Sequence, residues 1–147
     1  MESNANEFIA ILQDKGVEII EFSSHEKDTY RQEWFKRIVP ANKQQKARES
    51  YCLARSGFLW HVFSYEILDC IKGNEAKKAF NSLSKQKAVL LVNVGNIASC
   101  RLKNISNVTA ECLDVLNDVI LTGCNFEWVY VKTHESECGP YFYSIRK

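Results

Sequence analysis

The sequence predicts an α+β protein, with a mostly antiparallel central sheet of about five to six strands and N-terminal helices packed on it. Three observations support this class. Amphipathic helical patterns prevail in residues 1–57, and short runs rich in β-branched and aromatic residues prevail in residues 58–147. The chain has 147 residues, the length of one domain, without an internal repeat or a Pro/Gly-rich linker. We therefore predict a single domain over residues 1–147, with a helix-rich layer followed by a sheet-rich part.

The helix-rich layer contains three predicted helices and one short strand. The first helix covers residues 4–15 and ends at a glycine, and residues 17–22 (VEIIEF) follow as a strand. The second helix, residues 24–39, starts with Ser24 as its N-cap and stops before a proline. The third helix, residues 41–56, is polar, so we expect the two central helices to form a solvated layer.

The sheet-rich part alternates strands with two short helices. One run, AVLLVNV, is almost continuously apolar, as in a central strand covered on both faces, and a Gly-Asn turn leads into its neighbour. A later turn of Gly, Cys and Asn predicts a hairpin between the strands on either side of it. The predicted strands are residues 58–66, 88–94, 97–103, 118–123, 126–134 and 141–146. The predicted helices are residues 74–85 and 107–118, the second capped by Asn107 or Thr109.

Charge and cysteine usage argue against several classes of protein. The formal net charge is +1, with basic and acidic residues balanced in both parts, so nucleic acid is not an expected partner. A basic run at residues 43–55 is interrupted by Glu49 and is expected to be a solvated helix face. The six cysteines form no CxxC motif, and the first residues lack the pattern of a secretory signal. We therefore expect reduced thiols and a cytoplasmic protein, and no apolar run is long enough for a membrane span.

The most conspicuous segment is FEWVYVKTHESECGPYFY, residues 126–143, which combines aromatic and charged residues. In a strand, alternate residues share a face. One face of this strand would hold Phe126, Trp128, Tyr130, Lys132 and His134. Such a face offers stacking surface next to charge, which suits a planar or phosphorylated ligand. The alternative is that its aromatic side chains form core beneath a helix, since aromatic residues commonly dominate cores.

A polar turn after that strand holds His134, Glu135 and Cys138. If His61 of the strand FLWHVFSYE lies beside it, the two histidines and Glu135 could perform acid–base chemistry. Otherwise, a histidine in an aromatic strand is usually buried and hydrogen-bonded. The H-x3-C spacing of His134 and Cys138 could hold zinc or form a Cys–His pair, but a single pair supplies too few ligands. We therefore predict no metal site and no cofactor.

The same two segments carry a family resemblance. Residues 60–65 read W-H-x-F-S-Y, residues 126–135 read F-x-W-x-Y-V-x-T-H-E, and residues 139–142 read G-P-Y-F. These stretches resemble a small bacterial family of unknown function, of about this length and found mainly in spore-forming Gram-positive bacteria. The resemblance covers mostly the C-terminal two-thirds of the chain. It implies that the two segments matter together, and it brings no catalytic residue or activity with it.

We therefore expect a small binding protein that holds a small ligand, for example a nucleotide-like one, or a partner protein on the aromatic and histidine-containing sheet face. The absence of nucleotide-hydrolase, protease and esterase motifs favours binding over catalysis. An inhibitor or sequestering protein in bacteria–phage conflict is one role that suits such a small domain. The alternative is a hydrolase-type enzyme that uses His61, His134 and Glu135. The expected ligand-binding residues are Trp60, His61, Trp128, Tyr130, Lys132, His134, Glu135 and Tyr141.

Overall fold

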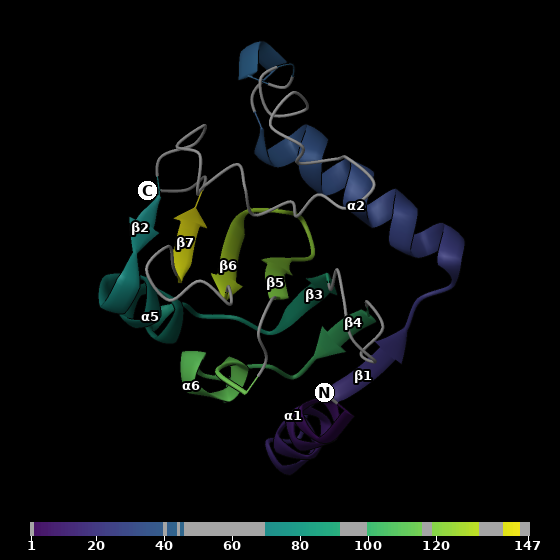
Figure 1. Cartoon of the computed structure of the whole chain (residues 1–147), viewed down its shortest axis with the longest axis vertical. Coiled ribbons are helices and arrows are strands. Elements are labelled where there is room, and N and C mark those ends of the chain that lie inside the picture. Colours follow the sequence, from purple (N-terminus) through teal and green to yellow (C-terminus); the bar gives the residue numbers. More distant parts are fainter. Residues whose placement is uncertain are drawn as a thin grey trace.

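The structure is a computed structural model that describes residues 2–39, 41–43, 45, 70–91, 100–115, 119–132 and 140–144 (Figure 1). Within these residues, seven strands form one sheet in which all neighbours are antiparallel. Across the sheet, the strands are β1 (Glu18–Glu21), β4 (Cys100–Lys103), β3 (Lys87–Leu91), β5 (Val119–Gly123), β6 (Trp128–Lys132), β7 (Tyr141–Ser144) and β2 (Ile71–Lys72). The helices are α1 (Glu2–Asp14), α2 (Ser24–Ile38), α5 (Gly73–Ser82) and α6 (Ala110–Leu113). The predicted α+β class is confirmed, with a wider sheet than expected.

Two hydrophobic cores lie on opposite faces of the sheet. One core joins alternate strand residues to α1, α5 and α6, and the other joins the intervening residues to α2. In β6, for example, Trp128 and Tyr130 belong to the first core, whereas Val129 and Val131 belong to the second. Figure 1 shows α1, α5 and α6 grouped on one side of the sheet and α2 on the other. We name these sides the α5 face and the α2 face.

A capping box starts α2. The Ser23 hydroxyl accepts a hydrogen bond from the Glu26 N–H (3.2 Å), and the Glu26 carboxylate accepts one from the Ser23 N–H (2.9 Å). The prediction of Ser24 as the N-cap is wrong by one residue, because Ser23 is the serine three positions before the glutamate that completes the box. Buried Trp34 and Ile38 then anchor the helix in the core of the α2 face.

The predicted hairpin between β5 and β6 is confirmed, but its turn changes which residues share a face. Phe126 has a φ of 62°, and its N–H donates to the Gly123 carbonyl (2.9 Å). This left-handed residue interrupts the strand alternation, so Phe126 lies in the core of the α2 face and Trp128 on the α5 face. The prediction that both residues share one face is therefore wrong. The turn also places the indole of Trp128 against the Gly123 backbone, where a Cβ would lie 2.8 Å from Nε1.

Two short elements differ from the prediction. Helix α6 is shorter than residues 107–118, and Thr109 is its N-cap but makes no side-chain capping hydrogen bond. Instead, Asn81 of α5 accepts from the N–H of Ala110 (2.8 Å), so a tertiary contact replaces the local cap. Strand β2 was not predicted, since two residues carry no periodicity and are defined by their pairing with β7. The predicted strand 58–66 and most of the predicted third helix lie outside the described residues.

Candidate functional site

Four of the eight predicted site residues belong to the described part of the chain. Trp60, His61, His134 and Glu135 lie outside the described residues, so their convergence and the hydrolase built on it stay predictions. The four described residues are Trp128, Tyr130, Lys132 and Tyr141. No group of three or more His, Cys, Asp or Glu side chains within the described ranges is placed to hold a metal ion.

Helix α5 covers the predicted aromatic face of β6. Tyr130 is fully buried and Trp128 is 8% exposed. The ring of Phe80 in α5 lies over both of them, with centroids 5.8 Å from Trp128 and 4.6 Å from Tyr130. The structure therefore places these two aromatic side chains in core beneath a helix, the second of the two arrangements that the sequence leaves open.

Tyr141 and Lys132 are not part of one common surface with those aromatic residues. Tyr141 is buried in the core of the α2 face, on the opposite side of the sheet from Tyr130. Lys132 ends β6 opposite Val119 of β5 and is partly buried. The described members of the predicted site thus divide between the two faces and one strand end.

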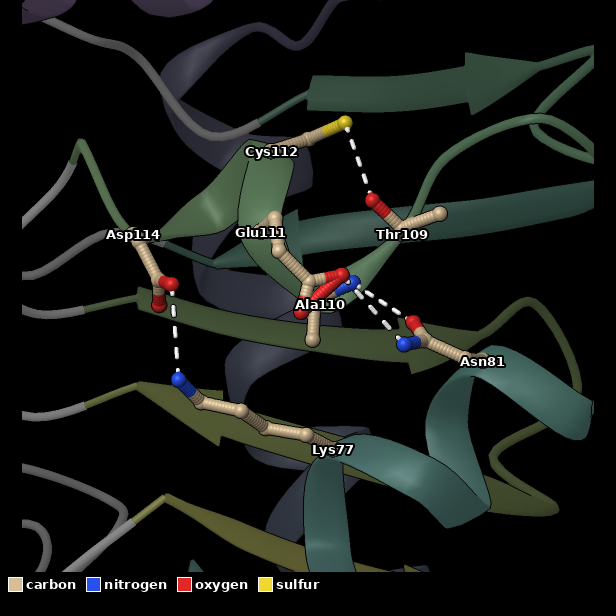
Figure 2. A network of polar contacts seen from close by, with 7 residues as sticks. All are labelled: Lys77, Asn81, Thr109, Ala110, Glu111, Cys112 and Asp114. Carbon is tan, nitrogen blue, oxygen red and sulfur yellow. Dashed lines mark hydrogen bonds and ion pairs between the residues drawn. The ribbon is translucent and has the colours of Figure 1, made fainter. Parts of the chain in front are cut away.

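Polar side chains link α5 to α6 at the protein surface near Tyr130. Figure 2 shows Lys77 and Asn81 reaching from α5 to Asp114 and Glu111, with Nζ–Oδ2 and Nδ2–Oε1 distances of 3.4 and 3.3 Å. Burial, and to a smaller extent the two carboxylates, raises the pKa of Tyr130. Its hydroxyl is therefore neutral, and it makes no hydrogen bond within the part of the chain that the structure describes. We interpret this network as a surface link between α5 and α6, whereas the buried side chains of both helices hold them on the sheet.

A second cluster of aromatic and basic side chains lies on the α2 face. We call it the cationic–aromatic cluster, and its members are Phe22, Tyr30, Lys87, Arg101, Cys124 and Phe126. It joins the end of β1, the N-terminal half of α2, strands β3 and β4, and the turn between β5 and β6. Phe22 and Phe126 are buried, Tyr30, Arg101 and Cys124 are partly buried, and Lys87 is exposed. The cluster therefore runs from the core to the protein surface.

Arg101 is at the centre of this cluster. The rings of Phe22 and Tyr30 stack with centroids 4.6 Å apart and planes 5° apart. The Arg101 guanidinium donates a hydrogen bond to the Tyr30 hydroxyl, and its Cζ lies 5.9 Å from the centroid of each of these two rings. A ring face attracts a cation, and the hydroxyl fixes the orientation of the guanidinium plane. The sheet and α2 thus hold Arg101 in one orientation.

The electrostatic environment of the cluster is positive. The hydrogen bond to Tyr30 raises the pKa of Arg101, and no carboxylate among the described residues forms an ion pair with its guanidinium. Burial raises the pKa of the Cys124 thiol, while Arg101 and Lys87 act in the opposite direction. Cys124 is therefore a neutral thiol that is influenced by both cations.

Sequence reasoning missed this cluster. The alternation in CRLK indicates that Arg101 and Lys103 share a face of β4, and that is the only local signal. The aromatic partners come from segments that are distant in the sequence, as the separation of Tyr30 and Arg101 shows. Their proximity depends on the pairing of β4 with both β1 and β3, which a strand pattern does not specify.

A comparison with protein families identifies the chain. A family model described as "Domain of unknown function (DUF4275)" matches residues 6–142, so the chain belongs to this family. The matched range includes every residue of the cationic–aromatic cluster and all eight predicted site residues. Comparisons with curated proteins and with solved structures find no match. The family assignment therefore adds no activity to what the structure shows.

Proposed function

We propose that this protein is a small cytoplasmic binding protein that holds a small planar, negatively charged ligand at the cationic–aromatic cluster. The observation that carries the proposal is the environment of Arg101. Its guanidinium is partly buried, is oriented by the Tyr30 hydroxyl, and has no ion-paired carboxylate among the described residues. Glu26 attracts this guanidinium but is exposed and hydrogen-bonded in the capping box of α2, so an anionic ligand would supply the direct ion pair that Arg101 lacks among the described residues.

The aromatic members of the cluster support a ligand with a flat apolar part. Tyr30, the partly exposed ring of this group, lies beside the guanidinium and is backed by two buried rings, with centroids 4.6 Å away for Phe22 and 6.3 Å away for Phe126. Ligand sites commonly combine such apolar walls with a few oriented polar groups. A nucleotide-like molecule has both parts. The proposal therefore keeps the ligand class predicted from the sequence but moves its site from the α5 face to the α2 face.

The broader roles suggested by the sequence have no additional support in the structure. A partner protein that inserts an acidic side chain next to Arg101 would use the same cluster in place of a small molecule. Inhibition or sequestration in bacteria–phage conflict stays a prediction from size and resemblance alone. None of the described helices is both long and apolar enough to cross a membrane.

Thermal unfolding with a panel of planar anions tests the proposal. The panel contains nucleoside mono-, di- and triphosphates and aromatic carboxylates, and mass spectrometry of the denatured protein searches for a co-purified ligand. A compound at one hundred times its Kd should stabilise the native chain by about 2.7 kcal/mol. Arg101→Gln should lose most of this stabilisation, because glutamine has no charge and a shorter reach.

Two further variants sharpen this experiment. Tyr30→Phe keeps the stacked ring and removes the hydroxyl that orients Arg101, so it should weaken binding less than Arg101→Gln does. Lys78→Gln changes an exposed lysine of α5 that is ion-paired to Glu75, and it should bind like the native chain. If Arg101→Gln were stabilised by the ligand as strongly as Lys78→Gln, the cluster would not be the binding site.

A further inference from the structure

Three basic residues stand together on the α2 face, where β1, β4 and β3 are neighbours (Figure 1). Lys87 of β3 and Lys103 of β4 are direct partners in the strand register, and Arg101 precedes Lys103 by two positions on the same face. Like charges directly opposite each other destabilise a sheet. The side chains of this row therefore create a local cost that a bound anion would remove.

Few carboxylates among the described residues compensate the charge of these three cations. Glu18 of β1 is the partner of Lys103 in the register, and its Oε2 lies 3.9 Å from the Lys103 Nζ. Glu26 attracts Arg101 electrostatically, but it is fully exposed and hydrogen-bonded within the capping box of α2. One ion-paired carboxylate leaves the group with net positive charge, mainly at Lys87 and Arg101.

The donors of these residues match the oxygens of phosphoryl groups. Arg101 offers a planar fork of N–H groups oriented by Tyr30, and each lysine adds a mobile ammonium group. Arg101 and Lys103 are two residues apart on one strand, so their Cα atoms are about 6.6 Å apart. Two adjacent phosphoryl groups would span this distance better than one.

We infer that Lys87, Arg101 and Lys103 form a subsite for the phosphoryl groups of a ligand that carries at least two of them. The inference rests on the proposed function and specifies its ligand class: the planar part contacts Tyr30, and the phosphoryl groups lie along β3 and β4. Lys103, which lies outside the cationic–aromatic cluster, extends the site toward β1.

Isothermal titration calorimetry with inorganic triphosphate tests the subsite separately from the planar part. We expect the native chain to bind triphosphate with an affinity that decreases as salt is added, because the contacts are charged. The double variant Lys87→Gln/Lys103→Gln should bind at least tenfold more weakly. Lys78→Gln removes one positive charge from an exposed ion pair on α5 and should leave the affinity unchanged.

The double variant also has a readout that does not depend on the ligand. Without triphosphate, it should unfold at the same temperature as the native chain or higher. The substitutions remove the repulsion between the paired lysines, and the Glu18–Lys103 ion pair that is also lost is exposed and contributes little. Weaker binding by this variant would then reflect a lost subsite in a folded protein. A large loss of thermal stability would contradict the repulsion on which the inference is based.

Citrate distinguishes phosphate recognition from general attraction of anions. Equal affinity for citrate and triphosphate would overturn the inference. If triphosphate failed to bind while a planar ligand still depended on Arg101, the phosphoryl subsite would be wrong and the proposed function would stand. If planar ligands also failed to distinguish Arg101→Gln from the native chain, both would be wrong.

Discussion

Replacing Phe80 with alanine tests whether α5 is a structural cover for the sheet. Phe80 is fully buried, and its ring contacts the rings of Trp128 and Tyr130. The buried Lys85 places its Nζ 4.4 Å from the same ring centroid, so the ring also makes a cation–π contact. Truncation of a buried phenylalanine costs about 3–5 kcal/mol through lost apolar burial and the cavity that remains. We expect a value near the upper end, about 4–5 kcal/mol, because two aromatic pairs and a cation–π contact are lost together.

Urea denaturation followed by circular dichroism measures the change in the free energy of unfolding, and thermal unfolding measures the change in Tm. For a chain of this size, a loss of about 4 kcal/mol lowers Tm by roughly 10–15 °C. Ile71→Ala is the control, because this apolar side chain is 44% exposed in an edge strand and its truncation should cost no more than about 0.5 kcal/mol.

The alternative interpretation of β6 makes the opposite prediction. If Trp128 and Tyr130 formed an open wall for a ligand, α5 would contribute little to stability. A cost below about 1 kcal/mol for Phe80→Ala, similar to that of Ile71→Ala, would therefore refute the interpretation of this face as core.

Three further predictions concern the cap of α2, two glycines and one buried thiol. Ser23→Ala removes the N-cap acceptor and should lower the free energy of unfolding by about 1 kcal/mol in urea denaturation. Gly123→Ala should cost about 1–3 kcal/mol in the same assay, because the new Cβ would lie 2.8 Å from Trp128. Gly16→Ala should cost about 1 kcal/mol, because its φ of 79° strains alanine although no atom lies close to the new Cβ. A larger cost for Gly16→Ala than for Gly123→Ala would contradict this reasoning. Burial, with a smaller contribution from a nearby glutamate, raises the pKa of Cys100 to about 11, so the folded thiol keeps its proton between pH 9 and 11 while the unfolded thiol loses it. The native chain should therefore lose about 2–3 kcal/mol more stability than Cys100→Ala over this interval, and equal losses would contradict the assignment.

Local periodicity predicted the elements well where a long pattern matched a continuous segment. The helical stripe of α2 and the apolar run of β3 both occur where expected, because each has enough residues to bury a defined face. The face of Phe126 was wrong because one left-handed residue reverses the strand alternation. Strand β2 was missed because two residues have no pattern of their own.

The candidate site was less predictable than the fold for a physical reason. Alternation along β6 correctly grouped Trp128 with Tyr130, but it does not say what covers them. That depends on α5, which precedes β6 by more than forty residues in the sequence. The cluster around Arg101 depends on a register between β1, β4 and β3, which only the folded sheet establishes.

The arrangement of α2 explains why a charged cluster can exist on this face of the sheet. Trp34, Phe35 and Ile38, in the C-terminal half of the helix, join a core with Val129, Val131 and Tyr141 of β6 and β7. The N-terminal half instead contacts Arg101 on β4 through the hydroxyl of Tyr30. If the apolar stripe of α2 covered this strand as well, Arg101 and Lys87 would be removed from water without a counter-charge, at a cost of several kcal/mol. Lys87 at the start of β3 and the polar row of β4 therefore require a partly uncovered part of the α2 face, and such a surface, aromatic on one side and cationic on the other, gives a planar anion access to both kinds of contact.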